Sequence, residues 1–408
     1  MMPATASDAA WRTAPAVVAV LDALAVGAGS AATRFVGGAV RDCLARRPVA
    51  DIDLATQLSP VETMRRLAAA GLKVVPTGLA HGTVTAISEG RPFEITALRE
   101  DVATDGRHAV VAFTDDWRAD AARRDFTINA MSMDPGGQVF DYFGGQDDLA
   151  AGRVRFVGAA DQRVAEDYLR ILRFFRFHAW YGRGAPDAGG LAAIARGRDG
   201  LHRISGERVR AEILRLLAAP DPGVVLEAMA ATGTLQAAVG LGDGDIAALL
   251  VVETAAQAAP DPLLRLAALA AGLDADGRRG LAGRMRLSND EAETLAALAP
   301  PWTTLGRTAA DWRQALHRDG AECFRRRALL AASVGETEVL APRLAAAAAW
   351  TPLAMPLSGG DIVALGVAPG PAVGTLLAEL EAEWRASDFK LDRAALLARA
   401  GGRVENDR

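Results

Sequence analysis

The chain has 408 residues, 50% of them hydrophobic, which is enough for two or three domains with sizeable cores. Its formal net charge of -5 excludes a globally basic protein, so any RNA contact must use local basic patches. The two cysteines, Cys43 and Cys323, exclude a disulfide framework and have no metal-ligand spacing. Neither a signal peptide nor a membrane-spanning apolar run is predicted. We therefore expect a cytoplasmic protein with no membrane partner; the sequence indicates no oligomeric state.

The first predicted elements are a helix over residues 14–28 and a short apolar strand at residues 35–36 that ends in two glycines. Gly37 and Gly38 have no Cβ atoms, so the backbone there can approach a phosphate group closely. The start of the following helix offers free N–H groups to that phosphate. Arg41, one turn into the helix, can add a charged contact. This segment predicts triphosphate binding at Gly38 and Arg41.

Two carboxylates follow in the sequence Asp51-Ile52-Asp53, which has the pattern of a strand. Because side chains alternate along a strand, Asp51 and Asp53 should point the same way with Ile52 buried behind them. Like charges on one face repel unless a cation lies between them. Magnesium ions bind carboxylate oxygens and bridge them to phosphates. We therefore predict that Asp51 and Asp53 are catalytic residues that hold two Mg²⁺ ions.

Helices and strands alternate up to about residue 158, which predicts a compact mixed α/β head. Ser59 and Glu62 have the spacing of a helix cap for a helix that ends near residue 70. Residues 83–87 and 93–98 form a predicted hairpin that carries Glu94. This residue is a candidate third carboxylate that holds metal or takes the proton from an attacking hydroxyl; ordinary exposure at a sheet edge is an equally good interpretation.

A polar segment and a basic helix come next. Residues 101–120 are predicted to form a long mobile loop. The following helix begins with Arg123 and Arg124 and carries Asp125 and Asn129 one turn apart. Arginines oppose the dipole at a helix start, and an anionic ligand would relieve that conflict.

A single helix is predicted from Asp161 to Tyr181. Its residues Asp167, Arg170 and Arg173 form a polar row at steps of three, and Arg176 lies further round the helix. One interpretation is a salt-bridged helix surface. The sharper hypothesis is a protein template for bases, because aspartate accepts from the exocyclic amine of C and A while arginine donates to their ring nitrogen. G and U present the reverse pattern, which would reduce their use roughly 10⁴-fold.

Beyond about residue 220 the sequence predicts helices and no catalytic arrangement. The run Arg325-Arg326-Arg327 is the best basic patch for an RNA backbone, although such runs are usually solvated helix faces.

The motifs together resemble those of the family that contains class II CCA-adding tRNA nucleotidyltransferases and bacterial poly(A) polymerases. The resemblance covers residues 30–235 and rests on four motifs in the family's order: G-G-x-V-R-D at 37–42, D-x-D at 51–53, R-R-D-F-T-x-N-A at 123–130 and E-D-x-x-R at 166–170. It implies that CMP and AMP are added from CTP and ATP to tRNA 3′ ends. A poly(A) polymerase, a partial CC- or A-adding enzyme and an inactive RNA-binding relative are the alternatives.

The resemblance also implies roles for particular residues. Arg124 would hold the nucleotide, Asp125 and Asn129 would recognise the ribose, and Asp167 with Arg170 would select the base. Arg173 and Arg176 would hold phosphates or stack nearby.

The expected fold class is α+β, with a small mixed α/β nucleotidyltransferase head followed by an all-helical neck, body and tail. The expected parts are an N-terminal helix (1–30), the catalytic head (31–158), a neck with the nucleotide-selecting motif (159–225) and a tRNA-binding body and tail (226–408).

Overall fold

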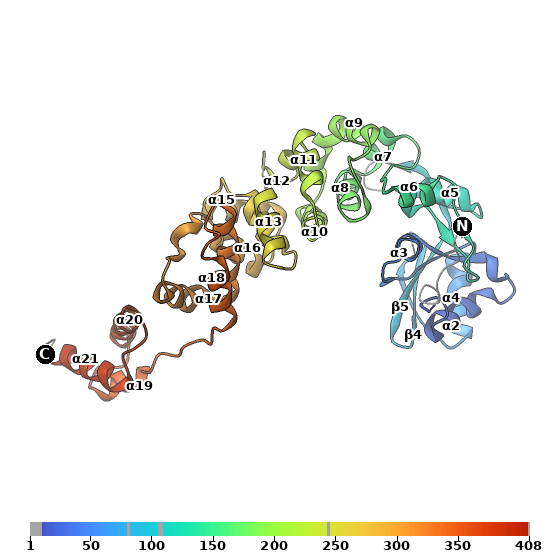
Figure 1. Ribbon diagram of the computed structural model, residues 1–408. Helices are drawn as coiled ribbons and strands as arrows, with labels where there is room; N and C mark the ends of the chain where they lie inside the picture. The colour runs from blue at the N-terminus through green and yellow to red at the C-terminus, as the bar shows by residue number, and fades with distance from the viewer. Residues whose placement is uncertain (1–9, 80–81, 105–108, 243–244, 407–408) are drawn as a thin grey trace. The chain divides into compact units, whose positions relative to one another are not determined.

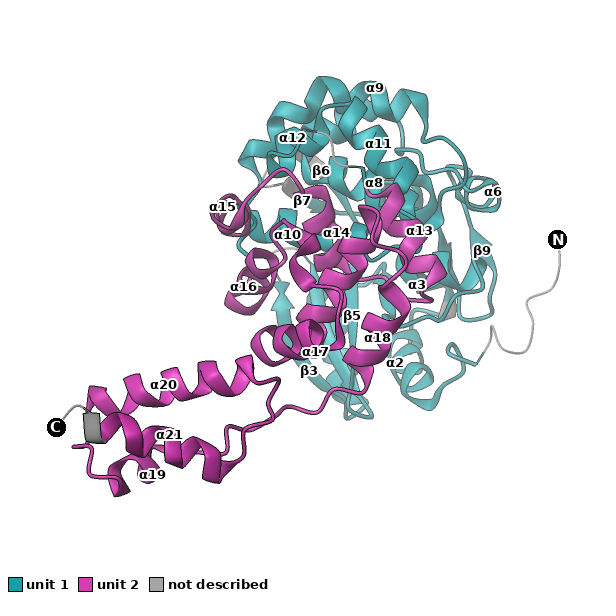
Figure 2. Ribbon diagram, turned by 60° about the vertical axis from the view of Figure 1, so that its left-hand side comes forward, with its two compact units in different colours: residues 1–245, 284–287 teal, residues 246–283, 288–408 magenta. Residues whose placement is uncertain are grey.

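The structure is a computed structural model that describes residues 10–79, 82–104, 109–242 and 245–406. Figure 1 labels its helices and strands in chain order. The chain divides into two compact units, which Figure 2 colours separately: unit 1 is Met1–Asp245 with Arg284–Leu287, and unit 2 is Ile246–Gly283 with Ser288–Arg408. Strands occur only in the first third of the described chain and helices follow, which confirms the predicted α+β fold class.

The head of unit 1 is built on a seven-stranded sheet in the order β3-β4-β5-β2-β1-β8-β9. Its strands are β1 (Thr33–Val36), β2 (Asp53–Thr56), β3 (Lys73–Gly78), β4 (Thr83–Ser88), β5 (Arg91–Ala97), β8 (Ser132–Met133) and β9 (Val139–Phe140). The pairs are antiparallel except β2 with β5, which are parallel. The predicted 83–87 and 93–98 hairpin corresponds to β4 and β5 and is confirmed.

One face of this sheet is buried by two helices, α2 (Pro15–Ala25) and α4 (Pro60–Ala69), seen beside β4 in Figure 1. Phe35, Leu54 and Ile95 are almost fully buried in the same hydrophobic cluster as residues of these helices. Since successive side chains of a strand point to opposite faces, Asp53 and Glu94 point away from this core. The hydrophobic pattern of the strands therefore decides which face carries the carboxylates.

The segment predicted as a mobile loop over residues 101–120 has regular secondary structure in most of its described residues. It forms a separate two-stranded sheet of β6 (Arg99–Thr104) and β7 (Ala109–Phe113), followed by helix α5 (Trp117–Ala122). Residues 105–108 lie outside the described part of the chain. The prediction of a loop was wrong for the described residues, because the apolar run at 109–113 pairs with residues 99–104 through backbone hydrogen bonds.

Besides α3 (Gly38–Leu44), the remaining described elements of unit 1 are also helical. They are η1 (Ser30–Ala32), η3 (Thr127–Asn129), α6 (Gly145–Ala151), α7 (Ala160–Glu166), α8 (Leu169–Tyr181), α9 (Ala188–Gly197), η4 (Arg198–Arg203), α10 (Gly206–Leu217), α11 (Gly223–Ala231) and α12 (Thr234–Val239).

The single helix predicted from Asp161 to Tyr181 is two helices, α7 and α8. Asp167 separates them with an extended backbone (φ -152°, ψ 108°), and its Oδ1 accepts the Leu169 N–H at 3.0 Å. Aspartate side chains cap helix starts better than they continue a helix, so this residue ends one helix and begins the next. The prediction of one continuous helix was therefore wrong.

All the regular secondary structure in the described residues of unit 2 is helical. The helices are α13 (Ala247–Ala255), α14 (Pro262–Leu269), α15 (Ala275–Met285, whose end belongs to unit 1), α16 (Asn289–Ala297), η5 (Trp302–Leu305), α17 (Ala309–Ser333), α18 (Leu340–Ala348), α19 (Gly359–Ala364), α20 (Pro371–Ala386) and α21 (Arg393–Asn406). The last three share a hydrophobic cluster of their own around Leu380 and Trp384. Within the described residues, none of the helices is both long and apolar enough to cross a bilayer.

Candidate active site

The glycine turn lies between β1 and α3, where Gly37 has a φ of 61°. L side chains rarely adopt this backbone conformation, so residue 37 needs to be glycine. A Cβ atom added there would lie 3.3 Å from Nη1 of Arg124. The turn therefore lets the Arg124 guanidinium lie directly against the backbone that leads into α3.

The acidic group lies on the sheet face opposite the core. Asp53 starts β2 directly opposite Glu94 in the parallel register with β5, and the buried Ile52 separates it from Asp51. Loss of water around the carboxylate, followed by the negative charges of Glu94 and Asp51, raises the pKa of Asp53 above its ordinary 3.8, and Arg124 lowers it in part. The three carboxylates therefore repel one another across a short distance.

This acidic group suits a divalent cation that is also bound by phosphate. Within the described parts of the chain, no three His, Cys, Asp or Glu side chains converge closely enough to hold a metal ion alone. Magnesium commonly uses one or two protein carboxylates and completes its shell with water and substrate phosphates. The hard oxygen donors and the raised pKa of Asp53 fit such an ion.

A cavity of about 510 Å³ is lined by residues of the head, by Asp167 and by residues of helix α8. Six arginines but only three aspartates line it, so its charge suits an anion. The lining residues are Gly37, Gly38, Arg41, Asp53, Arg99, Arg123, Arg124, Asp125, Asn129, Asp167, Arg170, Arg173 and Phe177. Seven of the nine predicted site residues thus meet at one cavity: Gly38, Arg41, Asp53, Arg124, Asp167, Arg170 and Arg173.

The other two predicted site residues, Asp51 and Arg176, lie outside that lining. Asp51 lines a neighbouring cavity of about 460 Å³ together with Glu94, and Asp53 belongs to both linings. Arg176 donates to Glu212 at 2.5 Å, with its guanidinium 4.1 Å from the Phe177 ring centre. It therefore supports the cavity wall from behind in this structure.

A buried aspartate holds the two arginines that precede the D-F-T motif. Asp120, 3% exposed, binds Arg123 at 2.8 Å and Arg124 at 3.1 Å. Burial alone would raise the pKa of Asp120, but the two guanidinium groups outweigh burial and lower it. Arg123 and Arg124 follow Asp120 by three and four residues at the end of α5, so the sequence held the signal for this contact.

The segment after these arginines is not the helix that the sequence predicts. α5 ends at Ala122, Phe126 is extended (φ -124°, ψ 150°), and only the short η3 follows. The Phe126 ring packs 5.0 Å from that of Phe156 and 5.4 Å from that of Phe177. Burial of this ring among aromatic residues distant in the sequence overrides the local helical pattern.

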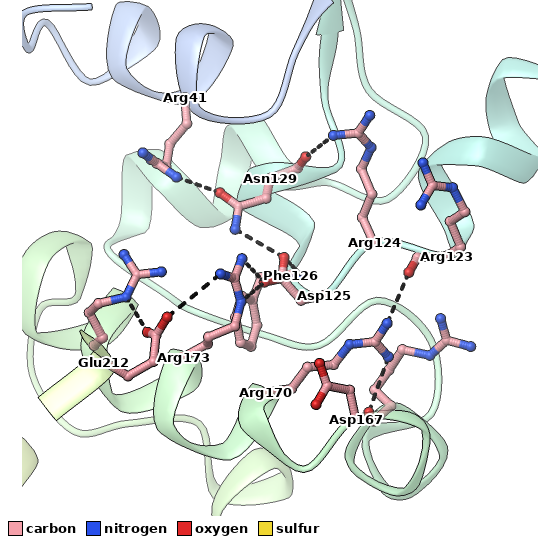
Figure 3. A network of polar contacts seen from close by, with 12 residues as sticks. Arg41, Arg123, Arg124, Asp125, Phe126, Asn129, Asp167, Arg170, Arg173 and Glu212 are labelled. Carbon is pink, nitrogen blue, oxygen red and sulfur yellow. Dashed lines mark hydrogen bonds and ion pairs between the residues drawn. The ribbon is translucent and has the colours of Figure 1, made fainter. Parts of the chain in front are cut away.

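Asp125 and Asn129 still meet, at the start of a polar network shown in Figure 3. Arg41 Nη1 donates to Asn129 Oδ1 at 2.7 Å, and Asn129 Nδ2 donates to Asp125 Oδ1 at 3.0 Å. Arg173 Nε donates to Asp125 Oδ2 at 2.7 Å, and Arg173 also lies 3.9 Å from Glu212. The network thus ties α3 and the D-F-T segment of the head to α8 and α10.

Asp125→Asn is expected to destabilise unit 1 by about 2 kcal/mol, because it weakens charged hydrogen bonds inside this network. Burial acts to raise the pKa of Asp125, but Arg173, the Asn129 amide and the Phe126 N–H together lower it. A carboxyl group whose pKa is lowered in the folded protein stabilises that protein at pH values above its unfolded pKa of about 3.9. This stabilisation is lost as the pH falls through the pKa of the folded protein. Urea unfolding should therefore separate variant from wild type at pH 6–8, with the difference shrinking below about pH 4.

The exposed residue Asp22 on α2 gives a matched control, since Asp22→Asn makes the same chemical change outside the network. Equal effects of the two substitutions, or a difference between Asp125→Asn and wild type that persists unchanged at low pH, would contradict this assignment.

Asp167 and Arg170 face the cavity but have other partners here. Asp167 Oδ2 accepts a hydrogen bond from Arg208 at 3.0 Å. Arg170 Nη1 donates to Glu166 at 2.6 Å and Nη2 donates to the Arg123 carbonyl at 3.3 Å. Its Nε–H has no partner within the described chain, and each Asp167 oxygen can accept a further bond.

Sequence reasoning missed several residues at this site. Arg99, at the start of β6, and Phe177 on α8 line the cavity, and Glu166 holds Arg170. Arg99 lay next to the segment expected to be a mobile loop, and Phe177 resembled any core aromatic residue. Only their tertiary placement distinguishes them.

The arginine run proposed for RNA in unit 2 has internal partners. Arg325 pairs with Glu322 at 2.7 Å, Arg326 pairs with Asp261 at 2.7 Å, and Arg327 donates to Thr304 Oγ1 at 2.8 Å. These contacts favour the interpretation of a salt-bridged helix surface for this run.

Comparison with known proteins gives matches along most of the chain. Residues 33–155 match the family model "Poly A polymerase head domain", and residues 190–239 match "Probable RNA and SrmB- binding site of polymerase A". The chain is 36% identical over 379 residues to the mitochondrial CCA tRNA nucleotidyltransferase 1 of Danio rerio, covering 90% of this chain and 86% of the relative. It is 34% identical over 368 residues to the CCA-adding enzyme of Geobacillus kaustophilus, covering 86% and 87%.

A solved structure of the Bacillus stearothermophilus CCA-adding enzyme in complex with CTP is also similar. It superposes with a TM-score of 0.73 at 27% identity, over 96% of this chain and 98% of that one. The likeness therefore extends over both units, beyond the head and neck motifs.

Proposed function

Because the chain belongs to the class II CCA-adding family of tRNA nucleotidyltransferases, we propose that it adds C, C and A to tRNA 3′ ends from CTP and ATP. The observation that carries this function is the cavity in which the glycine turn, Asp53 and the Asp167–Arg170 pair meet. The tRNA 3′-hydroxyl attacks the α-phosphate, and pyrophosphate leaves. A poly(A) polymerase shares the head, but relatives that cover nearly the whole chain are CCA-adding enzymes.

The chain's own residues bind and orient the triphosphate. Gly37 permits the close approach of the backbone, and Arg41 and Arg124 supply positive charge beside it. Arg173 adds charge from α8 while Asp125 fixes its position. Holding both reactants in line would supply a large part of the acceleration.

Enzymes of this family generally use a divalent metal, and we propose Mg²⁺ held by Asp51 and Asp53. When bound, this metal would lower the pKa of the attacking hydroxyl and neutralise charge on the leaving phosphates. Glu94 shares the face of Asp53 and is a candidate to hold the same metal or to accept the hydroxyl proton.

Base selection is assigned to Asp167 and Arg170. Asp167 accepts from the exocyclic amine that C and A share, and Arg170 donates to the neighbouring ring nitrogen. The unused Nε–H of Arg170 and the remaining lone pairs of Asp167 support this proposal.

The test uses a tRNA that ends before CCA, each labelled nucleotide in turn, and product lengths at single-nucleotide resolution. We expect addition of two C residues from CTP, then one A from ATP, and no further extension. Long A tails would identify a poly(A) polymerase, and addition of only CC or only A would identify a partial enzyme. An absence of all products with intact folding would reject the enzyme assignment.

A cytoplasmic location stays a prediction from the sequence, because the named relatives include mitochondrial proteins.

A further inference from the structure

A cavity of about 970 Å³ is lined by the last residues of α3 and α8 and by the residues that follow these helices. Gly38 and Arg41 of α3 and Arg170, Arg173 and Phe177 of α8 line the nucleotide cavity. Leu44 and Tyr181, the last residues of the two helices, line this one. The other lining residues are Ala45, Arg46, Arg47, Gln146, Asp147, Leu149, Ala150, Trp180, Gly182 and Arg183. None of the catalytic residues named above lines this cavity.

Three arginines give this cavity its charge. Arg47 Nη2 donates to the Trp180 carbonyl at 2.5 Å, and Arg183 Nη2 donates to the Ala150 carbonyl. In the part of the chain that the structure describes, no carboxylate forms an ion pair with Arg46, Arg47 or Arg183. The run at 325–327 in unit 2 differs, since Arg325 and Arg326 there have acidic partners. Asp147 is the single carboxylate among the lining residues, so the three arginines give the cavity a net positive charge.

Aromatic side chains lie beside this charge. The Arg47 guanidinium is 4.4 Å from the Tyr181 ring centre and 5.9 Å from that of Trp180. The Tyr181 hydroxyl donates to Asp42 at 2.6 Å, and the Arg41 guanidinium is 4.3 Å from the Tyr181 ring. Tyr181 is thus a fixed part of the wall between this cavity and Arg41 of the nucleotide cavity.

The backbone is also shaped around one of these arginines. Gly152 has a φ of 68°, and a Cβ there would lie 2.7 Å from Cβ and Nε of Arg183. The Arg183 N–H donates to the Gly152 carbonyl at 2.8 Å. Only a residue without a side chain allows Arg183 to lie in this position.

We propose that this cavity binds the sugar–phosphate backbone of the RNA substrate, a few nucleotides before the 3′ end that reacts. This inference rests on the proposed function. Arginines beside aromatic rings are typical of single-stranded RNA sites. The seven residues of α3 span about 10 Å, close to the length of three stacked nucleotides. Gly38 at the start of α3 lines the nucleotide cavity and Leu44 at its end lines this one, so a strand whose end lies in the nucleotide cavity would reach this cavity within about three nucleotides.

The test compares the double variant Arg46→Ala/Arg183→Ala with Arg65→Ala/Arg196→Ala. The control removes the same charge from unit 1 at arginines whose side chains are 65% and 62% exposed. Binding of tRNA lacking CCA is measured by fluorescence anisotropy over a series of salt concentrations. For the cavity variant we expect about tenfold weaker binding and a slope of log Kd against log salt reduced by about 1.4, because two phosphate contacts are lost. The KM values for CTP and ATP should stay unchanged.

A neutral methylphosphonate, placed singly at each of the last four phosphates, locates the contact. At one or two positions it should weaken wild-type binding but leave the cavity variant unaffected.

Unchanged tRNA binding in the cavity variant, or an equal loss in the control, would overturn the inference, while continued CCA addition would leave the proposed function intact. A raised KM for CTP with unchanged tRNA binding would instead assign the cavity to a free triphosphate and also overturn it. If the Tm of the double variant falls, the single variant Arg46→Gln replaces it, because this variant keeps the Arg183 contacts.

Discussion

Asp53→Asn is expected to reduce single-turnover CMP addition by about 10³-fold or more while the head stays folded. Loss of a ligand to the metal removes several kcal/mol of transition-state stabilisation. Asn keeps the size of the side chain but removes its charge. Rapid-quench measurement with tRNA lacking CCA, saturating CTP and Mg²⁺ gives the rate of the chemical step.

The same substitution should leave the Tm at pH 7 equal to or above that of wild type. The pKa of Asp53 is raised in the folded protein, so its ionised form is disfavoured there and removal of the charge relieves repulsion from Glu94 and Asp51. Added Mg²⁺ with CTP should raise the Tm of wild type more than that of the variant. Asp22→Asn is again the control and should change neither rate nor Tm.

Substantial activity in Asp53→Asn would reject its role as a metal ligand. A large fall in Tm together with lost activity would show instead that Asp53 supports the fold, against the repulsion inferred here.

Arg170→Ala is expected to reduce discrimination between CTP and UTP by about 10²-fold, measured as the ratio of their kcat/KM values. A base-edge contact of this kind contributes discrimination because the wrong base leaves polar groups unpaired. Binding of tRNA, measured separately, should change little, since Arg170 lies at the nucleotide cavity.

Arg163 provides a sharp control for this experiment. Arg163 and Arg170 bind the same carboxylate of Glu166, at 2.5 and 2.6 Å, but only Arg170 lines the nucleotide cavity. Arg163→Ala should lower the Tm and leave base choice unchanged. If both variants relax base choice equally, Arg170 acts by bracing the helices and does not contact the base.

Several features were predictable because they depend on short stretches of sequence. Ser59 caps α4 by accepting the Glu62 N–H at 3.3 Å, and the alternation in β4 and β5 follows from their apolar residues. The separation of an α/β head from a helical remainder follows from the change in pattern along the chain. Family motifs carry the rest, since they name the residue types that the chemistry requires.

The local sequence pattern predicted the wrong secondary structure where contacts with residues distant in the sequence compete with it. The Asp125–Asn129 segment has a helical pattern, yet Phe126 is extended because its ring is buried against Phe156 and Phe177. The break at Asp167 likewise depends on a side chain that caps α8 and binds Arg208 of α10. Helix propensity is weak beside burial of an aromatic ring or a satisfied carboxylate.

The sequence by itself determined which groups this protein possesses: a glycine turn, paired aspartates, and an aspartate and arginines spaced along the neck. Periodicity placed most of them on the right kind of element, because hydrophobic spacing acts over a few residues. Only the tertiary structure decided which of these groups meet. Asp51 lines a different cavity from Arg41, Arg176 turns to Glu212, and Arg46 joins Arg183 from 137 positions along the chain to make a second cationic cavity. These contacts depend on how the helices pack against one another, and no local sequence pattern predicts them.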